Sequence, residues 1–304
     1  MGAKMERGAR ISPFSFVAVR KLHMRRGARI GPFVFIKAHT FVMERDARIR
    51  PCSLFKVREI RLGRDSRFDP FVLVNCDFGP RSKLEVGRSA RVFSFSVLEP
   101  SEGISIGDQT GLGGHCLIFC HGSWPNYLEG APYSRGPVRL EDQVWIPWRV
   151  MILPNAEIGS GAVIGAHSLV RGKVPGGSLY SGVPARLVLD NVWTTLEDEK
   201  EKEVRLQEVL DSFHEFHQGR LRNKIRVLPL NQAGEEQAPD QETAFYSFGE
   251  MDQELLRRAM AMPKTTVLDL AGLWAHGTGP VAGLLVDHLA TFGVRLSSRH
   301  QDEI

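Results

Sequence analysis

His121 is the side chain of this 304-residue sequence whose position most favours chemistry. It opens a segment rich in turn residues and aromatics, HGSWPNYLEGAPYSRGP, which runs from residue 121 to 137. Imidazole titrates near neutral pH and can both accept and return a proton. A histidine at the base of a long loop is therefore a candidate for acid–base chemistry, although taken alone it is more often an ordinary surface residue.

The element that positions this loop is a repeated stagger of aliphatic residues through the first 190 positions. One series comprises Ile11, Ile30, Ile49, Phe68, Val92, Leu112, Ile146 and Ile164. Another apolar residue follows each of these by six positions, and a third series precedes most of them by six. A period held this tightly predicts one structural unit stacked many times.

Each unit is a run of six residues with an aliphatic first position and a small fifth position, as in Ile11 and Ser15. Three such runs predict one triangular turn of chain, and successive turns are expected about 4.8 Å apart, the strand spacing of a sheet. We expect an aliphatic residue at each corner and a small residue on each side, both pointing inward. The variable positions then point outward, as strand alternation requires.

Several segments after the loop carry a more specific signal. His121 is followed by Pro137-Val138-Arg139-Leu140, Val144-Trp145-Ile146, the glycine-rich run 158–166 and Gly182-Val183-Pro184-Ala185-Arg186. In this order they resemble the hexapeptide-repeat acyltransferase family, and most of all its sugar and antibiotic O-acetyltransferases. The resemblance covers roughly residues 8 to 190. It implies a left-handed parallel β-helix of about eight to nine coils over residues 1–190, and a homotrimer with each site between subunits.

The resemblance also implies roles for single residues. His121 would be the general base, acetyl-CoA the co-substrate of a direct transfer, and no metal would be needed. The backbone N–H of Trp148 would stabilise the oxyanion, although the family's glycine before it is Pro147 here, which has no N–H. Trp124 and Trp145 would contact the substrate. The groove for coenzyme A would be lined by Ala166, Arg171, Lys173, Pro184 and Arg186.

Charge is distributed unevenly along the chain. Residues 1–190 carry 27 Lys and Arg against 16 Asp and Glu, whereas residues 191–304 carry 12 against 19. Part of the basic excess is an outward column of one arginine per coil, comprising Arg10, Arg29, Arg48, Arg67 and Arg91. The column indicates either an anionic partner or a ladder neutralised by acids such as Glu44, Asp46 and Asp65, and we favour the second interpretation. A second outward column, of Phe14, Phe33, Phe71 and Phe95, should be covered by a neighbouring subunit or by the C-terminal segment.

Other features restrict the class of protein. His115 and His167 share an outward column, but two aligned histidines without a third make a poor zinc site. The four cysteines show neither zinc-type pairing nor a secreted disulfide framework, so free thiols are expected. Nothing resembles a signal peptide or a membrane span. We therefore expect a cytoplasmic protein with a small-molecule or saccharide acceptor, and no nucleic-acid partner.

The repeat ends near residue 190, and residues 191–304 are predicted to form a helical linker and a small α/β module. The pattern predicts helices over 196–218, 253–261 and 281–292, with strands near 245–246, 267–270 and 294–296. Residues 230–243 read as a polar linker or loop. A cap on the open end of the β-helix is the default role for the module.

Three functions compete on this sequence. The leading one is O-acetylation of a sugar hydroxyl; the second is N-acylation of an amino sugar or antibiotic. The third is a scaffold without catalysis that binds a partner through its arginine or phenylalanine column. A nucleotidyltransferase domain is not supported, because no glycine-rich nucleotide-binding segment precedes the repeats.

Overall fold

The computed structural model describes residues 2–122, 126–193, 196, 198–218, 220–221, 224–233, 241–277 and 279–299. The chain divides into two compact units, Met1–Thr194 and Thr195–Ile304, and each is described by itself.

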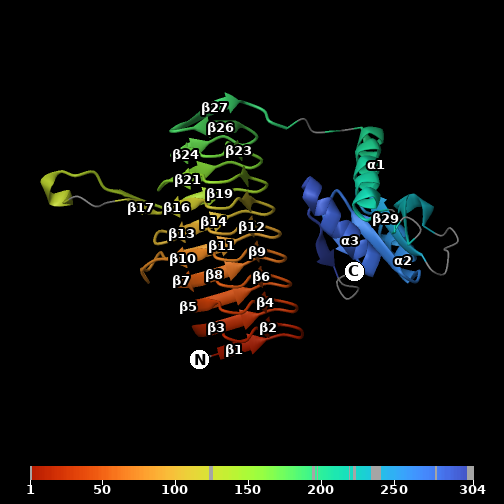
Figure 1. Cartoon of the computed structure of the whole chain (residues 1–304), viewed down its shortest axis with the longest axis horizontal. Helices are drawn as coiled ribbons and strands as arrows, with labels where there is room; N and C mark the ends of the chain where they lie inside the picture. Colours follow the sequence, from red (N-terminus) through yellow and green to blue (C-terminus); the bar gives the residue numbers. More distant parts are fainter. Residues whose placement is uncertain are drawn as a thin grey trace. The chain divides into compact units, whose positions relative to one another are not determined.

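The first unit is a stack of coils in which each turn of chain contributes short strands to three faces (Figure 1). One face is a ten-stranded sheet whose strands follow in chain order, all parallel except the last pair. Its strands are β2 (Arg10–Ile11), β4 (Arg29–Ile30), β6 (Arg48–Ile49), β9 (Arg67–Phe68), β12 (Arg91–Val92), β15 (Gly111–Leu112), β20 (Trp145–Ile146), β23 (Val163–Ile164), β26 (Leu179–Gly182) and β27 (Ala185–Leu189).

The other two faces are joined at one end, because β3 (Phe16–Met24) and β5 (Phe35–Met43) run through both. The face that follows the ten-stranded face along the chain is called the β16 face; it adds β7 (Leu54–Lys56), β10 (Leu73–Asn75), β13 (Val97–Glu99), β16 (Leu117–Phe119), β21 (Met151–Ile152) and β24 (Leu169–Val170). The third is called the β19 face; it adds β1 (Gly2–Met5), β8 (Glu59–Leu62), β11 (Lys83–Val86), β14 (Ile104–Ile106), β19 (Val138–Leu140), β22 (Glu157–Ile158) and β25 (Lys173–Val174).

The positions of aliphatic and small residues differ from the prediction. The aliphatic residues lie on the strands of the faces, as Ile30 does in β4, and the turn comes two to three residues later. The small residue follows the turn directly, as the buried Ser53 and Ser96 do. Only a small side chain fits beside a tight turn, whereas side chains on the strands reach the wide centre of the triangle.

The corner between the ten-stranded face and the β16 face is called the aromatic corner. In every coil from the first to the eighth, one residue there has a positive φ: Phe14, Phe33, Cys52, Phe71, Phe95, His115, Arg149 and His167. A left-handed conformation is unfavourable for residues other than glycine, so the tight turn is held by the packing of the coils on either side.

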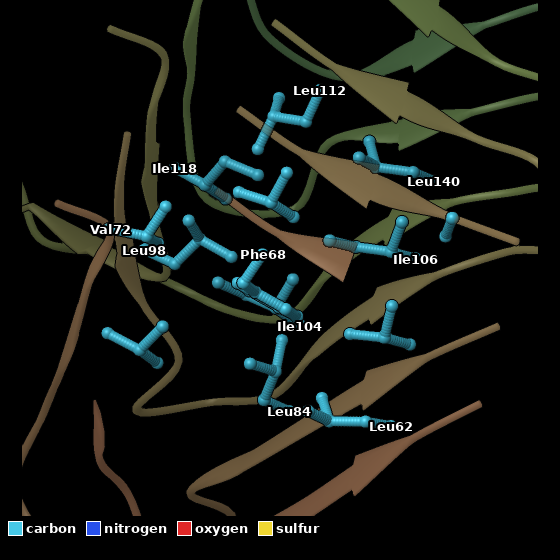
Figure 2. Close-up of a cluster of buried hydrophobic side chains, with 14 of the residues drawn as sticks. Leu62, Phe68, Val72, Leu84, Leu98, Ile104, Ile106, Leu112, Ile118 and Leu140 are labelled. Atoms are coloured by element: carbon cyan, nitrogen blue, oxygen red, sulfur yellow. The ribbon is translucent and has the colours of Figure 1, made fainter. Parts of the chain in front are cut away.

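The interior of the coils is one continuous apolar core. Figure 2 shows part of it, where Leu98 and Ile118 from the β16 face lie across the core from Ile106 and Leu140 of the β19 face. Each coil contributes side chains from three directions, so no coil can bury its apolar residues without its neighbours. The predicted class, a left-handed parallel β-helix followed by a small α/β module, is confirmed.

The second unit holds a five-stranded sheet in the order β28 (Ile225–Pro229), β29 (Glu242–Ser247), β30 (Thr265–Asp269), β31 (Trp274–His276) and β32 (Ser297–Arg299). Its helices are α1 (Glu199–Phe216), α2 (Gln253–Ala261) and α3 (Pro280–Leu289). All strand pairs are parallel except β30 with β31. The apolar side of α1, including Phe213, packs in one cluster with Leu285 and Leu289 of α3.

The three predicted helices and the strands near 245 and 267 are confirmed in this unit. The strand predicted at 294–296 is wrong, because the last strand begins at Ser297. The linker predicted at 230–243 lies partly outside the described residues; within it, η2 (Leu230–Gln232) is a short 3-10 turn and β29 begins at Glu242.

Candidate active site

His121 stands where the chain leaves the β-helix. It begins β17 (His121–Gly122), which pairs antiparallel with β18 (Ser134–Arg135), so the base of the loop is a short ribbon (Figure 1). Before the ribbon lies β16, and after it the chain re-enters the coil at β19. The imidazole is 48% exposed. The corner between the β16 face and the β19 face, from which this loop projects, is called the loop corner.

Glu99 of the preceding coil holds the imidazole. Its Oε2 atom lies 2.8 Å from Nδ1 of His121. A carboxylate only accepts hydrogen bonds, so Nδ1 donates, and the neutral ring carries its lone pair on Nε2. The Glu99 carboxylate is itself fixed, because it accepts from the N–H of Cys120 at 3.2 Å and from the N–H and hydroxyl of Ser101, each at 3.2 Å. The pair therefore has the arrangement of a base oriented by an acid.

A second carboxylate fixes the ribbon beneath the histidine. Glu102 has a side chain only 5% exposed and forms ion pairs with Arg81 and with Arg135, the residue opposite His121 in the ribbon. Burial acts to raise the pKa of Glu102, but the hydrogen bonds from Arg81 and Arg135 outweigh it and hold that pKa below its usual value. Glu102 therefore stays ionised and ties the loop to the coil.

The neighbouring thiol is not suited to nucleophilic attack. Cys120 is buried, and its Sγ donates to the carbonyl of Gly103 at 3.4 Å. Burial raises the pKa of the Cys120 thiol to about 12, so the thiolate is scarce at neutral pH. All four cysteines are free, as expected.

Three of the residues predicted to bind coenzyme A or the oxyanion cluster along the aromatic corner. Trp148 and Ala166 occupy equivalent positions in successive coils, because β20 pairs with β23, and the carbonyl of Trp148 accepts from the N–H of His167 at 3.1 Å. Pro184 lies on the next coil, in the turn between β26 and β27. The exposed Arg186 follows it on β27. An ordered series of this kind offers one continuous edge to a long, thin ligand.

Aromatic side chains extend this corner toward the N-terminus. The ring of Trp148 lies 5.8 Å from that of His115, which in turn stacks on Phe95 at 5.0 Å. His115 is therefore part of an aromatic stack. Among the described residues, no group of three His, Cys, Asp or Glu side chains is arranged to hold a metal ion.

The remaining predicted residues lie elsewhere. Arg171 is at the loop corner, two coils beyond Phe119, as the pairing of β16, β21 and β24 shows. Lys173 is on the β19 face, where its Nζ lies 3.0 Å from a carboxylate oxygen of Glu157. Trp145 is on the ten-stranded face. Trp124 lies outside the described residues.

One protomer does not bring His121 and Trp148 together. They lie at the loop corner and the aromatic corner, which are the two edges of the β16 face, so a strand of each coil separates them. A site that uses both residues therefore needs two copies of the chain.

Pro147 interrupts the backbone ladder beside Trp148. The equivalent residues of the coils before and after, Gly113 and Gly165, donate their N–H groups to Ile146 and Tyr180 at 2.6 and 2.7 Å. Pro147 has no N–H to donate, so this rung is absent and the local backbone differs from that of its neighbours.

Glu99 is a residue of the candidate site that sequence reasoning missed. The signal was present in the register: Leu98 and Ile118 are 20 residues apart, which places the acid one position after Leu98 beside the residues that lead to His121. Only a coil-by-coil alignment around the corner would have found it.

Comparison with known proteins gives the following matches. No family model matches the chain. It is 41% identical over 51 residues to WbbJ of Escherichia coli, whose name assigns it to lipopolysaccharide biosynthesis as an O-acetyl transferase, and 38% identical over 87 residues to YvoF of Bacillus subtilis, named an acetyltransferase. These matches cover 17% and 29% of this chain but only 26% and 48% of those proteins, so the chain spans half of their length or less.

Among solved structures, a hexapeptide-repeat acetyltransferase of Vibrio cholerae complexed with acetyl-coenzyme A is 28% identical, with a TM-score of 0.37. The match covers 45% of this chain and 71% of that one. In the described part of the chain, no helix is both long and apolar enough to span a membrane. The comparisons confirm the resemblance predicted from the sequence: the chain is similar to the hexapeptide-repeat acyltransferases.

Proposed function

We propose that this protein is an acetyl-CoA-dependent O-acetyltransferase that acts on a hydroxyl of a sugar or sugar-like acceptor, with His121 as the general base. The observation that carries the proposal is the hydrogen bond between Nδ1 of His121 and Glu99, which leaves Nε2 as the basic atom on an exposed corner. The similarity to named acetyltransferases supports the choice of reaction.

In the proposed reaction, Nε2 of His121 takes the hydroxyl proton of the acceptor, and the Glu99 carboxylate offsets the charge that develops on the ring. The acceptor oxygen forms its bond to the acetyl carbon of the thioester, and the carbonyl oxygen becomes the oxyanion of a tetrahedral intermediate. As this intermediate collapses, the carbon–sulfur bond breaks and the proton passes from Nε2 to the departing sulfur. Nothing in this sequence requires a covalent enzyme intermediate, in agreement with the buried, protonated Cys120.

The residues of the aromatic corner are proposed to hold acetyl-CoA. The N–H of Trp148 is the candidate oxyanion donor, because Pro147 cannot serve. Arg186, next to the aromatic corner, is exposed, which suits contact with phosphate groups. Arg171 is also exposed, but it lies at the loop corner and would reach the same ligand from a neighbouring copy. Lys173 fits this role less well than predicted, because its ammonium group already pairs with Glu157.

We propose a homotrimer whose subunits meet along the β16 face. An outward row on this face is apolar in every coil and consists of Phe16, Phe35, Leu54, Leu73, Val97, Leu117, Met151 and Leu169. A continuous apolar row of this length favours burial against another surface. The row also lies between the two corners that carry the parts of the proposed site, so a neighbouring copy would supply the missing part.

The test is an acetylation assay with the full chain, acetyl-CoA and a panel of neutral sugars, acidic sugars and amino sugars. Thiol release shows turnover, and product mass with hydroxylamine lability separates esters from amides. We expect an ester product that requires His121. An amide product would favour N-acylation, and failure to bind acetyl-CoA in calorimetry would contradict the enzymatic function altogether.

A further inference from the structure

The arginine column predicted from the sequence forms a straight row on the ten-stranded face. Arg10, Arg29, Arg48, Arg67 and Arg91 are paired residue by residue in the parallel strands β2, β4, β6, β9 and β12. Strands of a sheet lie about 4.8 Å apart, so five guanidinium-bearing residues follow one line about 19 Å long. The stack of these strands forms the lower half of the β-helix in Figure 1.

One of the acids expected to neutralise this row is engaged elsewhere. Glu44 forms its ion pair with Arg25, at 2.8 Å. Asp108, on a later coil, accepts from the backbone N–H of Arg88 at 2.7 Å. Within the described ranges, no ion pair or side-chain hydrogen bond joins Arg10, Arg29, Arg48 or Arg67 to a carboxylate.

The pKa of Arg67, the fourth arginine of the row, reflects burial and the nearby positive charges. This pKa is lowered, first by burial and then by the positive charges of Arg91, Arg48 and Arg50, while Asp69 acts in the opposite direction. The row therefore holds like charges close together, in the part of the molecule where an anion would relieve their repulsion.

The row ends on an aromatic ring. Arg91 pairs with Gly111, and Gly111 pairs with Trp145 in the next coil. A Cβ atom on Gly111 would stand 2.7 Å from the Trp145 ring, so the indole lies over the glycine, in the space that any side chain would fill. The half-buried indole thus follows directly after the last arginine of the row.

This combination favours an acidic polysaccharide. Single-stranded nucleic acid is commonly held by several aromatic rings on which successive bases stack, whereas this row offers five arginines and one indole. A line of single cations at regular spacing suits an extended chain with one carboxylate per sugar, and an indole suits the apolar face of a sugar ring. The strands that follow the row on this face, β15 and β20, belong to the coils that carry the loop and Trp148, so a chain that extends along the row reaches the aromatic corner near Trp148. His121 lies at the loop corner, opposite this face, and would be supplied by the neighbouring copy of the proposed trimer.

We propose that the arginine row and Trp145 bind an extended acidic polysaccharide, which is the acceptor of the reaction. The role of this polysaccharide as the acceptor rests on the proposed acetyltransferase function, whereas its binding to the row does not. This proposal takes the interpretation that was not favoured from the sequence; it is supported by the pairing of Glu44 with Arg25 and not with the row.

The experiment measures binding of the full chain, without acetyl-CoA, to oligogalacturonate long enough to span the five arginines. The variant Arg29→Gln/Arg48→Gln/Arg67→Gln removes three charges from the row. The matched control, Arg20→Gln/Lys37→Gln/Arg61→Gln, removes three exposed charges from β3, β5 and β8. We expect the row variant to lose at least about tenfold in affinity with a shallower salt dependence, and the control to stay within about twofold.

Three results would overturn the proposal. They are an equal loss in the control, equal binding of a neutral glucan of the same length, and tighter binding of single-stranded DNA or of anionic lipid vesicles. A charge-keeping variant, Arg29→Lys/Arg48→Lys/Arg67→Lys, with a thermal unfolding curve for each protein, separates loss of charge from loss of fold; a well-folded lysine variant should retain most of the affinity.

Binding and catalysis can fail separately in this design. If oligogalacturonate binds through the row but no acetyl transfer occurs, the proposed reaction is wrong and the binding site stands. If transfer to neutral sugars is rapid and equal in the row variant and the parent protein, the row is not the acceptor site.

Discussion

Nδ1 of His121 lies 2.8 Å from Oε2 of Glu99, although the two residues are 22 positions apart and belong to successive coils. The coil register creates this contact, since Glu99 ends β13 and His121 follows β16 directly above it. A solenoid can thus orient a base on its surface with an acid from the coil below.

Replacing Glu99 with glutamine should lower kcat by about 100-fold, within the usual range for loss of assistance to a general base, and leave the KM for acetyl-CoA within about twofold. An amide can donate to Nδ1 and so favours the wrong tautomer. The measurement is steady-state kinetics. The matched variant Ser101→Ala removes one hydrogen bond to the carboxylate and should cost far less. Full activity in Glu99→Gln would show that the acid has no part in the reaction.

The ribbon at the base of the loop should loosen in acid. The pKa of Glu102 is lowered in the folded protein, so its contribution to stability is complete above the ordinary carboxyl pKa of 4.5 and is lost as the pH falls through the lowered value. Hydrogen exchange at the backbone of His121 in β17 and Arg135 in β18 should rise across that range relative to the exchange of β16. In Glu102→Gln the exchange should already be raised at neutral pH and no longer change with acid. A parent protein without this pH dependence would contradict the anchoring role.

A site shared between copies should show complementation. His121→Ala removes the base from the loop corner, and Ala166→Trp blocks the aromatic corner. Each should be inactive alone, but co-expression of the two should restore activity to about a quarter of the sites, because half of the subunits supply each intact corner. Co-expression of His121→Ala with Glu99→Gln, both at the loop corner, is the control and should restore none. Absence of recovery in the first pair would place the whole site within one chain.

The fold was largely predictable because the aliphatic residues recur at a regular interval along the first 190 positions. Residues such as Ile30 and Ile49 recur at the pairing interval of the coils, so the sequence predicted which residues stack. It did not predict that they lie on the faces, because the pattern fixes the interval and not the position of the turn within it. The turn is shown by backbone conformation, such as the positive φ of Phe33, which a phenylalanine does not signal.

The site was less predictable. His121 could be predicted because it begins the long insertion. Glu99 and Glu102 contact their partners, His121 and Arg135, across coils, and a single acidic residue in the sequence does not indicate such a contact. In the second unit, β28 and β31 were missed because short strands between polar segments show no period of their own.

The cysteines should differ sharply in reactivity. Cys52 is exposed at the aromatic corner, whereas Cys120 is buried with a thiol pKa raised to about 12. At neutral pH an alkylating reagent should label Cys52 first and leave Cys120 unmodified until the protein is unfolded. Mass spectrometry of peptides at increasing times reads out both residues. Early labelling of Cys120 would contradict its place in the core beside the proposed base.

The central claim is that His121 removes the proton from the acceptor. The most direct measurement is single-turnover acetyl transfer by His121→Ala, with acetyl-CoA binding and the oligomeric state determined on the same preparation. The account predicts unchanged assembly, acetyl-CoA affinity within about twofold, and a transfer rate lower by at least about 100-fold. Transfer at the parental rate by a properly assembled variant would contradict it.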